Sequence, residues 1–187
     1  MDLELIDQLA EQRPDLQLVM IGPTVKIDPA SRPSRSNIHW LGSRHYSELP
    51  AYLSGWDVAM LPFARNDSTR FISPTKTPEY LAAGCPVVST SITDVITPYG
   101  REGLAEIADT APEYSAAIDR LLATDRTARL AHADSFLADL SWDRTYEQMW
   151  AHVERAISSR AALRASGMQS VSTGAGSVSR TSRSPEE

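Results

Sequence analysis

Residues 70–90, Arg-Phe-Ile-Ser-Pro-Thr-Lys-Thr-Pro-Glu-Tyr-Leu-Ala-Ala-Gly-Cys-Pro-Val-Val-Ser-Thr, combine a loop, a short helix and an apolar strand. Proline is tolerated in the first turn of a helix, so Pro78 favours a helix over residues 76–83 with Thr75 as its N-cap. Gly84 suits the left-handed backbone with which many helices end, and the apolar run after it predicts a strand. A helix that leads directly into an apolar strand is typical of α/β sheets.

Two charged side chains stand in the first turns of this helix. Lys76 and Glu79 are three positions apart, so they share one face of the helix. The first N–H groups of a helix attract anions, and Lys76 adds a full positive charge suited to a phosphate. Glu79 can accept hydrogen bonds from two hydroxyl groups, as a ribose would offer. The hypothesis is a nucleotide site, and its alternative is a surface ion pair that stabilises the helix by about 0.2–0.5 kcal/mol.

Helices and strands alternate on both sides of this stretch. We expect strands over residues 16–21, 38–41, 58–61, 87–89 and 104–108. We expect helices from residue 3 up to Arg13-Pro14, over 46–53, 76–83, 112–123 and 125–137, and from 142 into the 150s. The first strand is a nearly continuous apolar run, which predicts burial on both faces. Such alternation implies right-handed crossovers and an α/β fold with a doubly wound parallel sheet.

The beginning of the chain does not fit a whole domain of this class. A doubly wound domain normally starts with a strand and a phosphate-binding turn. No strand is expected ahead of Leu3, and no Gly-x-Gly-x-x-Gly or Walker motif occurs in the sequence. We therefore expect a sheet that lacks its first strand, in a chain that is a fragment of a longer protein.

Length and composition predict one domain and a tail. The 187 residues, 42% hydrophobic and 22% charged, are ordinary for a globular protein and few for two domains. Residues 1–157 carry the alternating pattern and are predicted to form the domain. Residues 158–187 are rich in Ser, Arg and Gly with few large apolar side chains, and they are predicted to be a disordered tail.

Charge and cysteine usage limit the expected partners. A net charge of −6 gives no overall field that would recruit nucleic acid. No apolar run approaches the ~18 residues that a membrane span needs. Cys85 is the only cysteine, which excludes a disulfide framework and suits a reducing compartment. We expect a cytoplasmic protein with no transmembrane segment, and peripheral contact with the inner face of the membrane stays open.

Five ordered pieces of sequence form a pattern more specific than any one of them. They are Leu18-Val-Met-Ile-Gly22, Asn37-Ile-His-Trp-Leu-Gly42, Leu49-Pro-Ala-Tyr-Leu53, Asp57-Val-Ala-Met-Leu-Pro62, and Ser73-Pro-Thr-Lys-Thr-Pro-Glu-Tyr-Leu-Ala-Ala-Gly84 with Pro86-Val-Val-Ser-Thr90. In order and spacing they resemble the carboxyl-terminal domain of glycosyltransferases with two Rossmann domains (GT-B). The resemblance is to bacterial enzymes of the retaining group that builds cell-envelope polysaccharides and exopolysaccharides, and it spans about residues 3–155.

The resemblance implies the donor-binding half of a hexosyltransferase-like enzyme. Such an enzyme transfers a sugar from a nucleoside diphosphate sugar to a saccharide or lipid-linked acceptor, in polysaccharide biosynthesis. By the same resemblance, Glu79 binds the ribose hydroxyls, Lys76 approaches the diphosphate, and the turn of Gly42, Ser43 and Arg44 lies near the nucleobase. No metal or other cofactor is implied, so dipoles and basic side chains must stabilise the departing diphosphate.

The loop ahead of Lys76 completes the candidate donor-binding set with Arg70, Ser73 and Thr75. The catalytic residues are not identified, because in this family they belong largely to an amino-terminal domain that the chain is expected to lack. The chain alone is therefore expected to be inactive. Two alternatives stay open: a nucleotide-sugar epimerase of the same architecture, and a non-catalytic nucleotide-binding module.

Overall fold

The computed structural model describes residues 1–25 and 27–172 of the chain. The chain divides into two compact units, Met1–Ala138 and Asp139–Glu187. The first unit ends ahead of the last helix, earlier than the boundary after residue 157 that the sequence predicts. The reason is that the last helix is continuous and makes a unit of its own.

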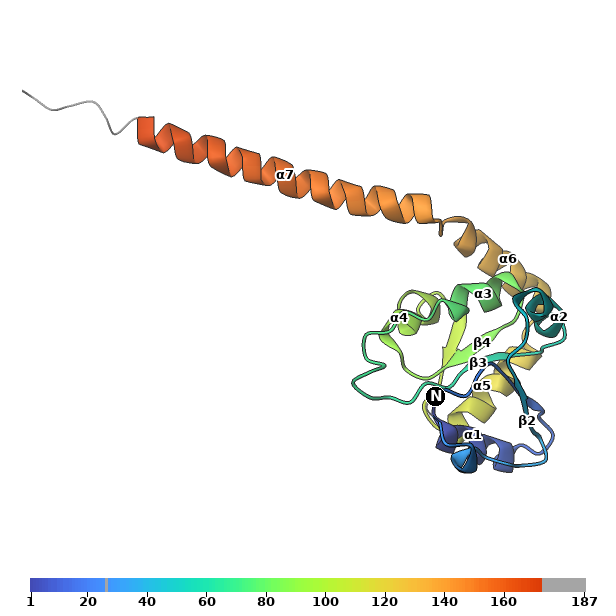
Figure 1. The fold of residues 1–187 in the computed structure, drawn as a ribbon. Helices are drawn as coiled ribbons and strands as arrows, with labels where there is room; N and C mark the ends of the chain where they lie inside the picture. The colour runs from blue at the N-terminus through green and yellow to red at the C-terminus, as the bar shows by residue number, and fades with distance from the viewer. Residues whose placement is uncertain (26, 173–187) are drawn as a thin grey trace, which may run out of the picture. The chain divides into compact units, whose positions relative to one another are not determined.

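Five parallel strands form two sheets in the first unit (Figure 1). The strands are β1 (Leu18–Ile21), β2 (Ile38–Gly42), β3 (Ala59–Leu61), β4 (Val87–Ser89) and β5 (Ala105–Ile107). β1 pairs with β2, and the second sheet has the order β3-β4-β5. All five predicted strands are confirmed, and the α/β class with parallel pairing is confirmed with them.

Helices precede, connect and follow these strands. They are α1 (Leu3–Gln12), α2 (Leu49–Leu53), α3 (Lys76–Ala82), α4 (Thr93–Val95), α5 (Ala111–Ala123) and α6 (Arg126–Ala138). Short helical turns at Pro29–Ser31, Tyr46–Glu48 and Ile96–Gly100 complete the unit. The sequence did not predict α4 or the turns at 29–31 and 96–100, because one or two helical turns are too short to show a 3.6-residue period.

The sheet of β3, β4 and β5 is covered by helices on both faces. Neighbouring residues of a strand point to opposite faces, and Val87 and Val88 of β4 are each 0% exposed. Val88 belongs to a core cluster with side chains of α1 and α5, whereas Val87 belongs to a second cluster with side chains of α3 and α6. Burial on both faces is typical of a parallel sheet.

β1 differs from this pattern. Only Leu18 of the strand is buried, and Val19, Met20 and Ile21 are partly exposed. The prediction that this strand is buried on both faces is therefore wrong. The edge of β1 away from β2 borders a cavity rather than another strand, and this leaves the strand partly open.

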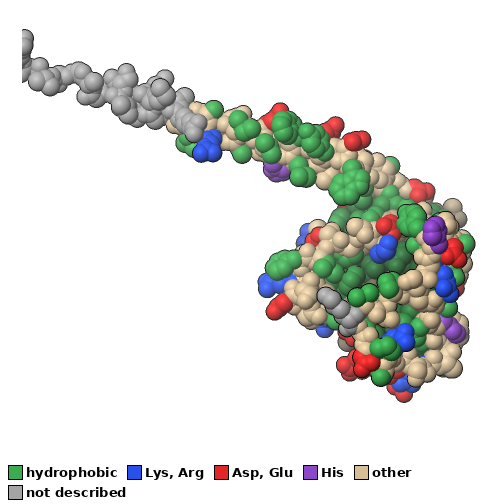
Figure 2. Space-filling model, viewed as in Figure 1, with side chains coloured by type: hydrophobic (Ala, Val, Ile, Leu, Met, Phe, Trp, Pro, Cys, Tyr) green, Lys and Arg blue, Asp and Glu red, His purple; other side chains and the backbone are tan. Residues whose placement is uncertain are grey.

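The second unit contains one long helix, α7 (Trp142–Ser172), which begins where the sequence predicts. It continues through residues 158–172, where the sequence predicts a disordered tail, because Ala and Arg favour helix even without apolar periodicity. Residues 173–187 lie outside the described residues. The exposed apolar side chains along the helix, green in Figure 2, include Trp142, Tyr146 and Met149. Among the described helices, none has a stretch both long enough and apolar enough to cross a membrane.

Candidate functional site

The side chains of Lys76 and Glu79 meet on the surface of α3. Lys76 Nζ lies 2.7 Å from Glu79 Oε2, and both side chains are 50% exposed. The predicted sharing of one helix face is confirmed. α3 follows the loop at the carboxyl end of β3, so the pair is carried on the connection from β3 to β4.

Three contacts fix α3 while this pair faces outward. Leu81 is buried in the core, and the ring of Tyr80 packs edge-on against Trp56 with 6.1 Å between ring centroids. At the end of the helix Gly84 has φ +77, as its predicted left-handed role requires. A Cβ at this position would lie 2.8 Å from Leu130 Cδ2 of α6, so glycine also allows the close approach of these helices.

The first turn of α3 leaves polar groups without partners. Thr75 is the N-cap residue, as predicted, but its side chain makes no capping hydrogen bond. Thr77, in the same turn, is 0% exposed, and its hydroxyl has no hydrogen-bond partner among the described residues. The structure therefore anchors α3 by its apolar side and not by its cap.

The loop between β3 and α3 holds its own shape. Asn66 Oδ1 accepts hydrogen bonds from the N–H groups of Ser68 and Thr69. Arg70 places its guanidinium 5.2 Å from the ring centroid of Phe71, and Phe71 is 83% exposed. Ser73, Thr75 and Arg70 are all exposed, so the predicted donor-binding residues of this loop lie at the surface.

A cavity of about 280 Å³ is lined by this loop and by residues that follow β4. Arg65 and Arg70 line it together with Ser91 and Thr93. Arg65 forms an ion pair of 3.0 Å with Asp109, and Asp109 Oδ1 also accepts the N–H of Ser91 at 2.8 Å. These contacts join the segments after β3, β4 and β5 at one edge of the sheet.

Asp109 was missed by the sequence reasoning. Its only signal is a carboxylate that comes just after a predicted strand, where the carboxyl ends of parallel strands meet. Neither this cavity nor the larger one between the sheets is lined by Lys76 or Glu79. The arginines of the loop and the Lys76–Glu79 pair are thus neighbours in sequence without sharing a cavity.

The turn of Gly42, Ser43 and Arg44 forms a separate candidate region. Gly42 has φ +67, and all three residues are exposed at the carboxyl end of β2. Arg44 Nε donates a hydrogen bond of 2.9 Å to the hydroxyl of Tyr52. No hydrogen bond or ion pair joins this turn to α3 within residues 1–25 and 27–172.

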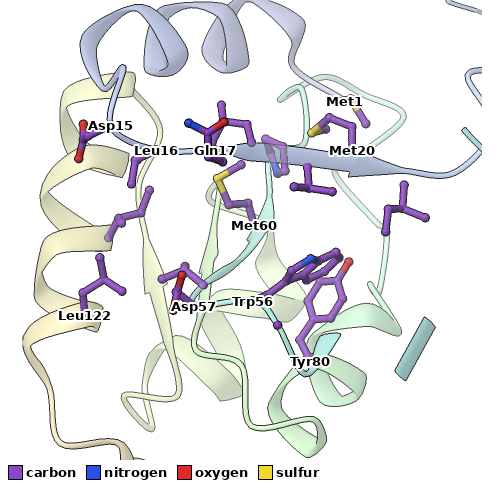
Figure 3. Close-up of a pocket in the computed structure, with 17 residues that line it drawn as sticks. Met1, Asp15, Leu16, Gln17, Met20, Trp56, Asp57, Met60, Tyr80 and Leu122 are labelled. Carbon is purple, nitrogen blue, oxygen red and sulfur yellow. The ribbon is translucent and has the colours of Figure 1, made fainter. Parts of the chain in front are cut away.

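A larger cavity of about 440 Å³ lies between the two sheets (Figure 3). Residues of β1 line one side, and the segment 55–62 lines another. Figure 3 places Met60 between Gln17 on one side and Trp56 on the other, with Leu122 of α5 at a third side. The cavity is walled mostly by β1 with the residues just ahead of it and by the segment that leads into β3.

The cysteine side chain has a structural position in the fold. Cys85 is buried, and its thiol donates to the carbonyl of Leu53 at 3.2 Å. Burial raises the pKa of this thiol, which disfavours the reactive thiolate. Within the described ranges, no cluster of three or more His, Cys, Asp or Glu side chains could hold a metal ion.

Comparison with known proteins identifies the family. Residues 3–124 match the family described as Glycosyl transferases group 1. Because the match covers well over half of the chain, the chain belongs to this family. It is also similar to a Bacillus subtilis (strain 168) protein named as a teichuronic acid biosynthesis glycosyltransferase, TuaH, with 30% identity over 95 residues. That match covers 49% of this chain and 24% of the relative, so the chain matches only about a quarter of the relative's length.

Proposed function

We propose that this chain is the donor-binding, carboxyl-terminal part of a retaining glycosyltransferase with two Rossmann-like domains. Its donor is a nucleoside diphosphate hexose, and its acceptor is a saccharide or a lipid-linked saccharide. Membership of the glycosyltransferase family supports the transfer reaction. The relative is named for teichuronic acid biosynthesis, which supports a role in polymer biosynthesis for this chain too. We place the reaction in the cytoplasm, without a metal ion, with the acceptor groups on an amino-terminal domain.

One observation carries the donor assignment. Lys76 and Glu79 form an ion pair on an exposed helix face, with 2.7 Å between Lys76 Nζ and Glu79 Oε2. A lysine ammonium has three donors, so Lys76 can keep one for Glu79 and turn the others to a diphosphate. The second carboxylate oxygen of Glu79 remains for the ribose hydroxyls. The pair therefore offers a cation for a diphosphate and an acceptor for ribose hydroxyls on one exposed helix face.

The free energies of the two kinds of contact favour a ligand-binding role for Lys76 and Glu79 over a purely structural one. An exposed i, i+3 ion pair stabilises a helix by about 0.2–0.5 kcal/mol. A hydrogen bond between a charged group and a phosphate contributes about 1.5–3 kcal/mol. Redirecting Lys76 toward a diphosphate thus costs much less than the new contact contributes. The exposed Arg70, Ser73 and Thr75 are proposed to surround the diphosphate, and Gly42, Ser43 and Arg44 to face the nucleobase.

The sheet topology supports the proposed domain type. In a doubly wound sheet the chain begins at the centre and adds strands first on one side and then on the other. β1 and β2 form one sheet and β3, β4 and β5 form another, each in chain order. We propose that they are the two halves of one doubly wound sheet, and that its first strand is missing between β1 and β3.

The test is calorimetry of the chain with uridine, guanosine and adenosine diphosphates and with inorganic pyrophosphate. Lys76→Ala is expected to weaken both pyrophosphate and the preferred nucleotide by about 10–100-fold, since it removes one charge-assisted contact. Glu79→Gln is expected to weaken the nucleotide and leave pyrophosphate unchanged, because its partners are ribose hydroxyls.

Matched controls are Arg101→Ala and Glu102→Gln. Both residues are exposed and precede β5, at the amino end of the strand. They are expected to leave binding unchanged. Equal affinities of the wild-type chain and Lys76→Ala would refute the role of Lys76. If none of the three diphosphates binds at millimolar concentration, the chain by itself is not a donor-binding unit.

A further inference from the structure

A stripe of apolar side chains runs along one side of α7. Its residues recur mostly three or four positions apart, which places them on one side of a helix. Each is at least 44% exposed, and apolar side chains are seen in green along this helix in Figure 2. The apolar stripe consists of Trp142, Tyr146, Met149, Trp150, Val153, Ile157 and Leu163. Exposed apolar side chains gathered in this way mark an interaction surface.

The apolar stripe has the seven-residue repeat of a coiled coil. In such a repeat, positions a and d face the partner helix and positions e and g flank them. Positions a fall on Tyr146, Val153 and Arg160, and positions d fall on Trp142, Met149, Ala156 and Leu163. Trp150 and Ile157 occupy positions e. Over residues 142–163 the partner that fits this surface is therefore another helix with the same repeat.

The charges along α7 are divided between its two halves. Residues 142–154 contain three acidic side chains and one basic side chain, whereas residues 155–163 contain two basic and no acidic side chains. A parallel pair of these helices would place like charges side by side and Arg160 against its own copy. An antiparallel pair places the acidic half of each helix beside the basic half of the other, and the two helix dipoles also oppose each other favourably. The charges therefore fit a second copy of α7 in antiparallel orientation.

One antiparallel register gives the apolar side chains apolar partners. In it, Tyr146 faces Leu163 of the second copy, and Val153 faces Ala156 of the second copy. The e positions match as well, because Trp150 then faces Ile157 of the second copy. By the two-fold symmetry of such a pair, each of these contacts occurs twice.

The size and the rigidity of the apolar stripe suit a stable pair. Three of its seven side chains are aromatic, and each aromatic side chain can bury about 150–250 Å². With the other four, the stripe approaches the roughly 800 Å² that each partner buries in a standard interface. The rings of Tyr146 and Trp150 stack with 6.2 Å between centroids, and Trp150 Nε1 donates to Glu154 Oε1 at 2.9 Å. These rings are thus oriented ahead of association, which lowers its entropic cost.

We infer that the apolar stripe of α7 is a self-association surface, on which two copies of this chain pair as an antiparallel coiled coil. The surface lies outside the proposed donor-binding residues. The inference therefore goes beyond the proposed function and does not depend on it.

The first test is sedimentation equilibrium of the full chain. The wild-type chain is expected to be a dimer at about 50 µM, with a dissociation constant in the micromolar range. Val153→Glu is expected to raise that constant at least about 100-fold, because it places two carboxylates inside the apolar contact. Ala151→Glu is the matched control, since it adds the same charge at position f, away from the apolar stripe, and is expected to leave the dimer intact.

Three outcomes of this experiment would overturn the inference. The first is a wild-type chain that stays monomeric at about 0.1 mM. The second is a Val153→Glu chain that dimerises as well as Ala151→Glu, which would place the contact outside the apolar stripe. The third is a monomeric wild-type chain that binds phosphatidylglycerol vesicles and loses this binding in Val153→Glu, which would assign the stripe to a lipid surface.

Disulfide trapping tests the antiparallel orientation. Tyr146 and Leu163 are 17 positions apart, about 26 Å along a helix, so Tyr146 lies far from its own copy in the antiparallel pair. An oxidised mixture of Tyr146→Cys and Leu163→Cys chains is expected to form the mixed disulfide, and neither variant alone to form a cross-linked dimer. Cys85 stays in place because it is buried. A cross-linked dimer of Tyr146→Cys alone, or no disulfide in the mixture, would overturn the antiparallel pairing.

Discussion

The helices α5 and α3 both follow strands of the β3–β4–β5 sheet, yet their first turns are built in opposite ways. In α5, Thr110 and Glu113 form a capping box. Glu113 Oε2 accepts the N–H groups of Asp109 at 2.8 Å and Thr110 at 3.0 Å. In α3, the N-cap side chain of Thr75 makes no such bond, and charged side chains stand exposed on the helix surface.

The two first turns differ in electrostatics as well. The hydrogen bond from the N–H of Asp109 holds the pKa of the Glu113 carboxyl below its ordinary value. A lowered folded-state pKa means that the stabilisation by Glu113 is present above the unfolded-state pKa and is lost as pH falls through the folded-state pKa. The carboxylate of Glu113 in the first turn of α5 is thus occupied by hydrogen bonds within the fold. Among the described residues, the hydrogen-bond partner of the Glu79 carboxylate is the half-exposed Lys76, and this availability is what a binding site requires.

The largest change in stability is expected from a substitution in the core packed against α5. Tyr114 is 0% exposed, and its hydroxyl donates to the carbonyl of Leu61 at 3.2 Å. Tyr114→Ala is expected to lower the free energy of unfolding by about 3–5 kcal/mol, because it leaves a cavity where a ring was packed. Urea unfolding followed by circular dichroism measures the loss.

Tyr114→Phe is the matched control for this prediction. It removes only the hydroxyl and is expected to cost about 0.5–1.5 kcal/mol, since the carbonyl of Leu61 also accepts the N–H of Thr90 at 3.2 Å. If the two substitutions cost the same, the ring of Tyr114 does not carry the packing of α5 on the sheet.

A smaller effect is expected from the caps themselves. Thr110→Ala removes a side chain that accepts the N–H of Glu113, and it is expected to cost about 0.5–2 kcal/mol. Thr75→Ala, at the equivalent position of α3, is expected to change the free energy of unfolding by much less, because no capping bond is lost. Equilibrium unfolding of both variants gives the difference directly. A cost for Thr75→Ala equal to that of Thr110→Ala would remove the distinction between the two helices.

Much of this architecture is predictable from local signals. Pro78 and Gly84 fixed the ends of α3 within one residue, because proline and glycine restrict the backbone wherever they stand. The contact between Lys76 and Glu79 followed from helical spacing alone. α7 extends beyond its predicted end, because a run of Ala, Ser and Arg has helix propensity but no apolar stripe.

Other features depend on residues that only the fold brings together. The Arg65–Asp109 ion pair joins positions 44 residues apart, and no spacing rule in the sequence indicates it. The partial exposure of β1 was likewise missed, because the sequence shows the apolar run and not the empty space beside it. Local patterns therefore located the candidate residues, whereas the cavities between the elements required the structure.

The smallest effect, and the sharpest test of the α3 first turn, is expected at Thr77. This residue is 0% exposed, and its hydroxyl lacks a partner among the described residues. Burying an unpartnered hydroxyl is unfavourable, so Thr77→Val, which keeps the shape of the side chain, is expected to raise the free energy of unfolding by about 0.5–1 kcal/mol. Thermal and urea unfolding of the variant measure the gain.

Thr90→Val is the matched control, because Thr90 is equally buried but fully engaged. Its hydroxyl accepts the N–H of Phe63 at 3.1 Å and lies 3.4 Å from the carbonyl of Leu61. This substitution is expected to cost about 1–2 kcal/mol, since it leaves the Phe63 N–H without that acceptor. A loss of stability in Thr77→Val would show that the Thr77 hydroxyl is bonded in solution. The first turn of α3 would then be as well satisfied as that of α5, and the contrast between the two helices would rest on their charged side chains alone.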